Sequence, residues 1–187
     1  MTHKENVPKW VRQRFAATIQ YMNEKGTSWI FKKLQDSDEV YYIQYTQNRK
    51  IGYKLSKKTI YWNPNAFYKN TNGTIVFPAT ILAHEGRHAL QHDEYGEEKY
   101  KELKETADPE YGDLIENKVI TTTEQVIAKL HSDIKEEETT RTDHKGKMFV
   151  MDEYSFMDAC NESYTAIPER FRENILEYLR VIWNIGE

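Results

Sequence analysis

The segment Ala83–Ala89 contains two histidines and a glutamate in the order His-Glu-x-x-His. His84 and His88 are four residues apart, so on a helix they project from one face about one turn apart. Two neutral imidazoles at this spacing can bind one Zn²⁺ at roughly 2.0–2.1 Å each. Glu85 lies beside His84, where it can hold a water next to the metal and take its proton. The pattern predicts a catalytic zinc site with His84 and His88 as ligands and Glu85 as the general base.

A catalytic zinc ion has three protein ligands and one open position, so a third ligand must lie outside this motif. His92 follows His88 by four residues. On a continuing helix it is about 12 Å of axial rise from His84, too far for all three histidines to converge. We therefore expect His92 at an exposed helix end and a downstream carboxylate as the third ligand.

Glu116 and Glu124 are the two candidate carboxylates. The segment Asp113-Leu-Ile-Glu116 resembles a capped helix start. A helix over 113–134 places Glu116 near the centre of an apolar stripe, where an ionised carboxylate is costly unless it is paired or bound to metal. Glu124 lies at the stripe's edge, but Thr121-Thr-Thr-Glu124 is itself a capping-box sequence that can start a new helix. The pattern favours Glu116 and leaves Glu124 as the alternative.

Peptide hydrolysis also needs a group that stabilises the developing oxyanion, usually a Tyr, His or Arg side chain. His144, Tyr154 and Tyr164 are candidates, and no spacing rule selects one of them.

The chain around the motif resembles the zincin metallopeptidases, in particular the gluzincin-like ones with two motif histidines and a distant glutamate. The residues that carry this are Tyr61-Trp-Asn-Pro64, a polar loop, and Pro78 leading into Leu82-Ala-His-Glu-Gly-Arg-His-Ala89, as in small bacterial effector or toxin and phage-encoded metallopeptidases. The resemblance implies a Zn²⁺ ion, a protein or peptide substrate, and Glu85 as general base and acid. Gly86 departs from the family, which often has a bulkier apolar residue there. A mid-helix glycine costs about 1 kcal/mol relative to alanine, so we expect another element to approach closely at this position.

Hydrophobic periodicity and turn residues predict the elements that position these side chains. We expect helices over 8–24, from 78 through the motif, over 113–134 and over 168–185, and strands over 28–34, 39–46, 51–55, 59–62 and 74–77. The biased segment 135–146 is expected to be a solvated connection. The order predicts an α+β, zincin-like fold: an N-terminal helix, a small antiparallel or mixed sheet, the motif helix and C-terminal helices.

Composition excludes several other classes of protein. The length of 187 residues suits one domain over 1–187, and the net charge of -4 argues against nucleic-acid binding. No apolar run is long enough to span a membrane, and the N-terminus lacks a signal peptide. With Cys160 as its only cysteine, the chain forms no internal disulfide. We expect a cytoplasmic protein, or one exported without a classical signal peptide; the oligomeric state stays open.

Two readings compete with a zinc-dependent peptidase. One is a catalytically silent zincin-fold binding or structural module of a phage or toxin system, which an intact Glu85 argues against. The other is an immunity or adaptor protein with a chance motif, which would bind no stoichiometric zinc.

Overall fold

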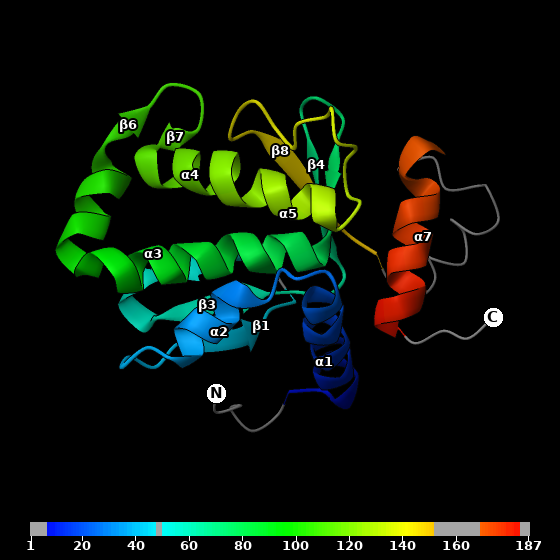
Figure 1. Cartoon of the computed structure of the whole chain (residues 1–187), viewed down its shortest axis with the longest axis horizontal. Helices are drawn as coiled ribbons and strands as arrows, with labels where there is room; N and C mark the ends of the chain where they lie inside the picture. Colours follow the sequence, from blue (N-terminus) through cyan, green and yellow to red (C-terminus); the bar gives the residue numbers. More distant parts are fainter. Residues whose placement is uncertain (1–6, 48–49, 152–168, 184–187) are drawn as a thin grey trace.

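The structure is a computed structural model that describes residues 7–47, 50–151 and 169–183. A long helix, α3 (Pro78–Glu105), crosses its middle (Figure 1). The segment α4 (Leu114–Lys118), η2 (Val119–Glu124) and α5 (Gln125–Leu130) returns antiparallel along one side of α3. On the other side lie α2 (Trp29–Gln35) and a small sheet. The fold is therefore a mixed α+β arrangement, as the sequence predicts.

The N-terminal helix is confirmed as α1 (Lys9–Glu24), which ends before Gly26 in the left-handed region, at φ 70°. The strand expected over 28–34 is wrong, because this segment forms α2. Ile30, Phe31 and Leu34 are buried, and their spacing places them on one helical face. That face packs on α3, so burial of this apolar stripe favours the helix.

Two three-stranded sheets flank the helices. The mixed sheet has the order β1-β3-β2, with β1 (Tyr42–Tyr45) parallel and β2 (Gly52–Lys54) antiparallel to β3 (Thr59–Trp62). A short 3-10 turn, η1 (Leu55–Lys57), joins β2 to β3. The antiparallel sheet has the order β5-β4-β8. Its strands are β4 (Ala66–Asn70), β5 (Ile75–Val76) and β8 (Gly146–Val150). The sequence does not predict β4 or β8, whose pairing joins segments far apart in the chain.

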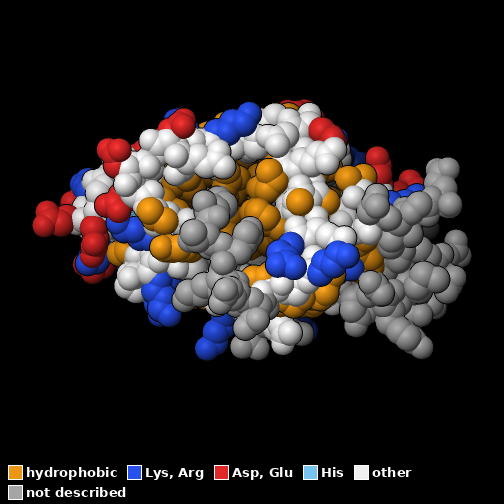
Figure 2. Space-filling view, turned by 90° about the horizontal axis from the view of Figure 1, so that it is seen from below, with side chains coloured by type: hydrophobic (Ala, Val, Ile, Leu, Met, Phe, Trp, Pro, Cys, Tyr) orange, Lys and Arg blue, Asp and Glu red, His pale blue; other side chains and the backbone are white. Residues whose placement is uncertain are grey.

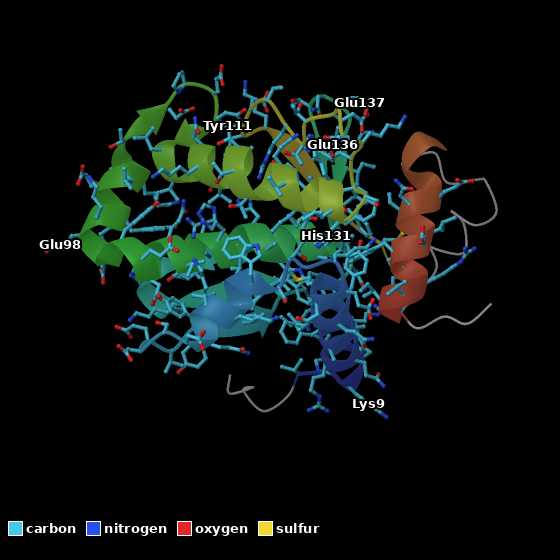
Figure 3. All side chains as sticks on the ribbon, in the orientation of Figure 1. Lys9, Glu98, Tyr111, His131, Glu136 and Glu137 are labelled. Atoms are coloured by element: carbon cyan, nitrogen blue, oxygen red, sulfur yellow. The ribbon has the colours of Figure 1, made fainter. Side chains whose placement is uncertain are left out.

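The motif helix begins at Pro78 as predicted, and the indole N–H of Trp62 donates to the Pro78 carbonyl at 2.8 Å. Gly96 interrupts it with φ 76° and ψ 164°, and the chain turns there toward Glu98, which Figure 3 labels at the far end. The expectation of an exposed His92 is wrong. Its side chain is buried, and the Tyr53 hydroxyl lies 2.6 Å from its Nδ1.

A β-hairpin, β6 (Ala107–Asp108) and β7 (Gly112–Asp113), connects α3 to α4. The Asp113 side chain caps α4 by accepting from the Glu116 amide at 2.8 Å, as the capping pattern predicts. The helix then continues through η2, a π-helical turn, instead of starting again at Thr121. Beyond this turn the apolar stripe predicted for a helix over 113–134 is not buried, since Val126 and Leu130 are about half exposed.

The connection after α5 is mostly exposed, as the sequence predicts, but Thr140 and Arg141 within it are buried. At the other end of the chain, the helix predicted over 168–185 forms α7 (Glu169–Trp183), which packs on α1. Its Tyr178 ring lies 6.2 Å from Phe67 and 5.2 Å from Phe77, so α7 also covers one face of the β5-β4-β8 sheet.

Apolar side chains also reach the surface. Figure 2 shows hydrophobic side chains gathered in the middle of one face, with Lys and Arg among them and acidic side chains around its edges. Trp10, Trp29, Val40 and Tyr42 are among the exposed large hydrophobic residues. Within the described ranges, no helix has both the length and the apolar character that a membrane span requires.

Candidate metal centre

His84, His88 and Glu116 converge on one point between α3 and α4. One ligand atom from each lies within 4.8 Å of the other two, so this group could hold a metal ion. The two Nε2 atoms are 3.1 Å apart, and Glu116 Oε2 and Oε1 lie 3.3 Å from His84 Nε2 and 3.2 Å from His88 Nε2. Ligand atoms around a tetrahedral ion at about 2.0–2.1 Å are themselves roughly 3.3 Å apart. Each histidine nitrogen therefore lies at about this separation from the other and from one of the two Glu116 oxygens.

The polar atoms of this group are also left with incomplete hydrogen bonding. Glu116 Oε2 is buried and receives no hydrogen bond from the described residues. Buried polar atoms normally have a partner, and an orphaned one needs an explanation such as an ion. Two imidazole nitrogens and a carboxylate oxygen form a donor set that zinc and other divalent transition metals accept. The residues present thus fit a divalent metal ion, zinc among them.

Glu124 lies on the opposite side of the His84 ring. Its Oε2 is 2.7 Å from His84 Nδ1, and its carboxylate also accepts from Arg141, through Nε at 3.0 Å and through Nη2. All three side chains are buried. The hydrogen bond to Glu124 places a proton on Nδ1 and directs the Nε2 lone pair toward His88 and Glu116.

Burial and the neighbouring charges shift the pKa values of His84, Glu116 and Glu124. Burial would lower the pKa of His84, but hydrogen bonds and charges from Glu116 and Glu124 outweigh it and raise the pKa to about 10. Burial would raise the pKa of Glu124, yet the Arg141 charge and His84 lower it to about 2. Burial would also raise the pKa of Glu116, but its close contacts with His84 and His88 outweigh burial and hold this pKa well below the usual range. A metal ion binding here must displace the proton from His84 Nε2.

Glu85 lines the same cavity and is held by the edge strand β2. The backbone N–H of Tyr53 donates to Glu85 Oε2 at 2.8 Å. Because this donor is part of a sheet, it fixes the direction of the carboxylate without using a flexible side chain. Gly86, the next residue, contacts α2: a Cβ there would lie 2.9 Å from the Phe31 ring. The close approach predicted for Gly86 is therefore confirmed.

The cavity has a volume of about 420 Å³, within the usual range of ligand pockets, roughly 300–1,000 Å³. The Tyr100 hydroxyl lies 3.5 Å from His88 Nδ1 and also lines it. His144, one of the predicted oxyanion-stabilising candidates, lines the cavity with its Nε2 3.6 Å from Glu116 Oε2, and it is half exposed. An exposed imidazole at the wall of the cavity is free to contact a bound substrate.

The other two candidates for stabilising the oxyanion, Tyr154 and Tyr164, lie outside the described residues, as does the single cysteine, Cys160. Sequence reasoning missed Arg141, which lies in a segment whose many charged residues indicate a solvated loop. It also missed Tyr53 and Tyr100, for which the sequence offers no signal because their contacts with the site depend on tertiary packing.

Comparison with protein-family models, curated proteins and solved structures gave no match to this chain.

Proposed function

We propose that this chain is a zinc-dependent peptidase with a zincin-like, gluzincin-type site. The observation that carries this is the convergence of His84, His88 and Glu116, with Glu85 lining the same cavity. His84 and His88 come from one helix and Glu116 from the next. In this proposal Glu116 is the third ligand, and Glu124 orients His84 from the other side of its ring.

A zinc ion held by His84, His88 and Glu116 would supply Lewis-acid chemistry: it would lower the pKa of water toward about 7 and would polarise a carbonyl group. Glu85, held by the Tyr53 amide, accepts a proton from the attacking water and passes it to the departing amine. His144 lies beside Glu116 and donates a hydrogen bond to the carbonyl oxygen as negative charge develops on it. The substrate in this proposal is a protein or peptide.

The silent binding module predicted as the alternative has no use for Glu85. A metal clip requires only the three ligands, whereas Glu85 extends into the cavity and is fixed there by a backbone hydrogen bond. This arrangement supports turnover over a purely structural role.

The first test measures zinc per chain in protein purified without added metal. We expect about one zinc in the wild type and a marked loss in Glu116→Ala, since two histidines alone bind weakly. Glu98→Ala is the control, because Glu98 is exposed at the far end of the structure. No zinc in the wild type, even after titration, would overturn the proposal, and full occupancy in Glu116→Ala would exclude Glu116 as the third ligand.

The same preparation is then tested on a library of quenched fluorescent peptides. Glu85→Gln should keep its zinc and lose at least about 100-fold in cleavage rate, since it removes the general base. A wild type that binds zinc and cleaves no peptide would favour the silent module. Full activity in Glu85→Gln would contradict the proposed role of Glu85.

A further inference from the structure

One face of the β5-β4-β8 sheet is directed toward the candidate metal centre. Tyr68 on β4 is in register with Val76 on β5 and with Met148 on β8. Side chains in register across neighbouring strands project to the same side of a sheet. All three line the cavity that contains His84 and Glu116. They therefore form a continuous row across three strands, beside the metal group.

The opposite face of this sheet belongs to the core. Phe67 and Phe149, the neighbours of Tyr68 and Met148, are in register and stack with ring centroids 5.4 Å apart. Tyr178 of α7 covers them from outside. Val76 is itself buried in the core, whereas Tyr68 and Met148 are half-buried, so these two side chains give the cavity-facing row its accessible surface.

Helix α3 adds a fourth apolar side chain. Ile81 precedes His84 by three residues, so both project from the same side of the helix, one turn apart. Ile81 also lines the cavity. We call Tyr68, Val76, Ile81 and Met148 the apolar row. It begins directly beside the first metal-binding histidine.

The Tyr68 ring is fixed in place from two sides. The Arg141 guanidinium lies 5.2 Å from the ring centroid, with its charge paired to Glu124. On β8, a Cβ at Gly146 would overlap the Tyr68 ring, so the absence of a side chain there makes room for it. A ring packed in this way is a preformed wall, which lowers the entropic cost of binding against it.

Polar residues of the cavity come from other elements. Lys104 belongs to the second part of α3 and lies 3.8 Å from Asp113, and His144 lies near Glu116. Both are about half exposed. The cavity thus has an apolar side built from the β5-β4-β8 sheet and a polar side toward α4.

We propose that the apolar row is a specificity subsite that binds one large apolar side chain, such as leucine, methionine or phenylalanine, of the residue flanking the cleaved bond. This inference rests on the proposed peptidase function and adds the class of substrate. Exchanging an apolar side chain for a smaller one in such a pocket typically changes binding by about 10- to 200-fold per methylene. A charged side chain is rejected more strongly, because the row is apolar and its nearest cation, Arg141, is already paired with Glu124.

The test uses short peptide hydroxamates, which bind zinc through the hydroxamate group and differ only in one adjacent side chain. Leucine, alanine and glutamate versions are titrated into zinc-loaded wild-type protein by calorimetry. We expect the leucine probe to bind at least about 10-fold more tightly than the alanine probe, and the glutamate probe to bind most weakly.

Met148→Glu and Val150→Glu form a matched pair of variants. Both residues lie on β8 and point to the same side of the sheet, but only Met148 lines the cavity. Met148→Glu should remove the preference for leucine over alanine, while Val150→Glu should retain it. If Met148→Glu does not fold, the relative affinities of the three probes for the wild-type protein still test the subsite.

The outcomes separate the subsite from the proposed function. Equal affinities for the three probes in wild type would overturn the apolar subsite while leaving zinc binding and the peptidase intact. Loss of the leucine preference in Val150→Glu as well would overturn the assignment to these residues. If zinc is bound and no hydroxamate binds, the metal has no open position, and both the peptidase proposal and the subsite fall.

Discussion

The two ring nitrogens of His84 face different carboxylates: Glu116 lies 3.3 Å from Nε2 and Glu124 lies 2.7 Å from Nδ1. The two carboxylates that the sequence leaves as alternatives therefore occupy different positions around the His84 ring. Glu116 shares its side of the ring with His88, whereas Glu124 is paired with Arg141. A carboxylate that fixes the tautomer of a histidine contributes to metal affinity without touching the metal.

Glu124→Gln should weaken zinc binding about 10- to 100-fold, because a neutral amide oxygen is a poorer acceptor for the His84 Nδ1–H. The variant also leaves the buried Arg141 guanidinium without this partner, which we expect to cost about 3–5 kcal/mol of the free energy of unfolding. Zinc affinity is measured by competition with a chelator, and stability by urea unfolding of the metal-free protein.

A double variant distinguishes the two effects. Glu124→Gln with Arg141→Met removes both charges, so stability should recover while zinc affinity stays low. The exposed Glu137→Gln serves as the control and should change neither quantity. Wild-type zinc affinity in Glu124→Gln would show that this carboxylate does not orient His84.

The π-helical turn between α4 and α5 decides where the two carboxylates point. Glu116 and Glu124 are eight residues apart, and a regular α-helix would rotate one about 80° away from the other. The wider i→i+5 turn brings both toward α3. The hydroxyls of Thr121 and Thr122 donate to the carbonyls of the residues four positions earlier, at 2.7 and 2.6 Å. Such bonds bend helices, and they help satisfy carbonyls at the turn.

Gly96 redirects the second part of α3 toward the site. Its φ of 76° with ψ of 164° lies in a region that is essentially restricted to glycine. Beyond this kink, Tyr100 becomes buried in the cavity beside His88 and 5.7 Å from the His92 ring. The kink thus folds a helix that would otherwise extend into solvent back over the candidate metal centre.

Gly96→Ala should destabilise the protein by about 1–3 kcal/mol, although alanine is the better helix former. Nothing lies within 4 Å of the added Cβ, so backbone conformation alone accounts for the loss. Urea unfolding measures it, with Glu98→Ala as a nearby helical control expected within about 0.5 kcal/mol of wild type. A neutral or stabilising Gly96→Ala would contradict the requirement for this backbone conformation.

At the scale of the molecule, a buried polar network joins the elements at the start of α3. His131, which Figure 3 labels at the end of α5, lies 2.7 Å from the Thr27 hydroxyl and 2.8 Å from the Thr80 hydroxyl. Burial lowers the His131 pKa to about 3, so the ring is neutral. Nearby, Asp133 accepts from the Phe77 amide at 2.8 Å, at the N-terminus of α3. These contacts hold the first turn of the motif helix.

Asp133 should make stability depend on pH. Burial raises its pKa to about 8, outweighing hydrogen bonds from Phe77 and Thr80, whereas the unfolded value is about 3.8. Between these values the folded chain retains a proton that the unfolded chain has lost, so stability is full below about pH 4 and falls as pH rises through about 8. Asp133→Asn should flatten this decline while keeping an acceptor for the Phe77 amide.

The measurement compares urea unfolding of metal-free wild type and Asp133→Asn between pH 5 and pH 8. The difference between the two proteins cancels contributions from other titrating groups, including His84. We expect the variant to gain stability relative to wild type as pH rises. Parallel pH profiles would show that Asp133 does not bind this proton in the folded state.

Features that depend on neighbouring residues along the chain could be predicted from the sequence alone. The spacing of His84 and His88 places both on one face of any helix, and the Pro78 start and the Asp113 cap are local signals that the structure follows. The same holds for α1 and α7, whose amphipathic patterns continue over several turns. Gly86 indicated a close approach, since a mid-helix glycine is otherwise costly.

The distant groups that contact these residues could not be predicted, because those contacts depend on tertiary packing. The π turn broke the 100° periodicity on which the choice between Glu116 and Glu124 depended. Arg141 could not be placed, because its burial arises from an ion pair with Glu124, seventeen residues earlier in the chain. His92 was expected in solvent and is covered by Tyr53 from a separate strand. Periodicity reports which way a side chain points from its own element, whereas burial and partners depend on what packs against that element.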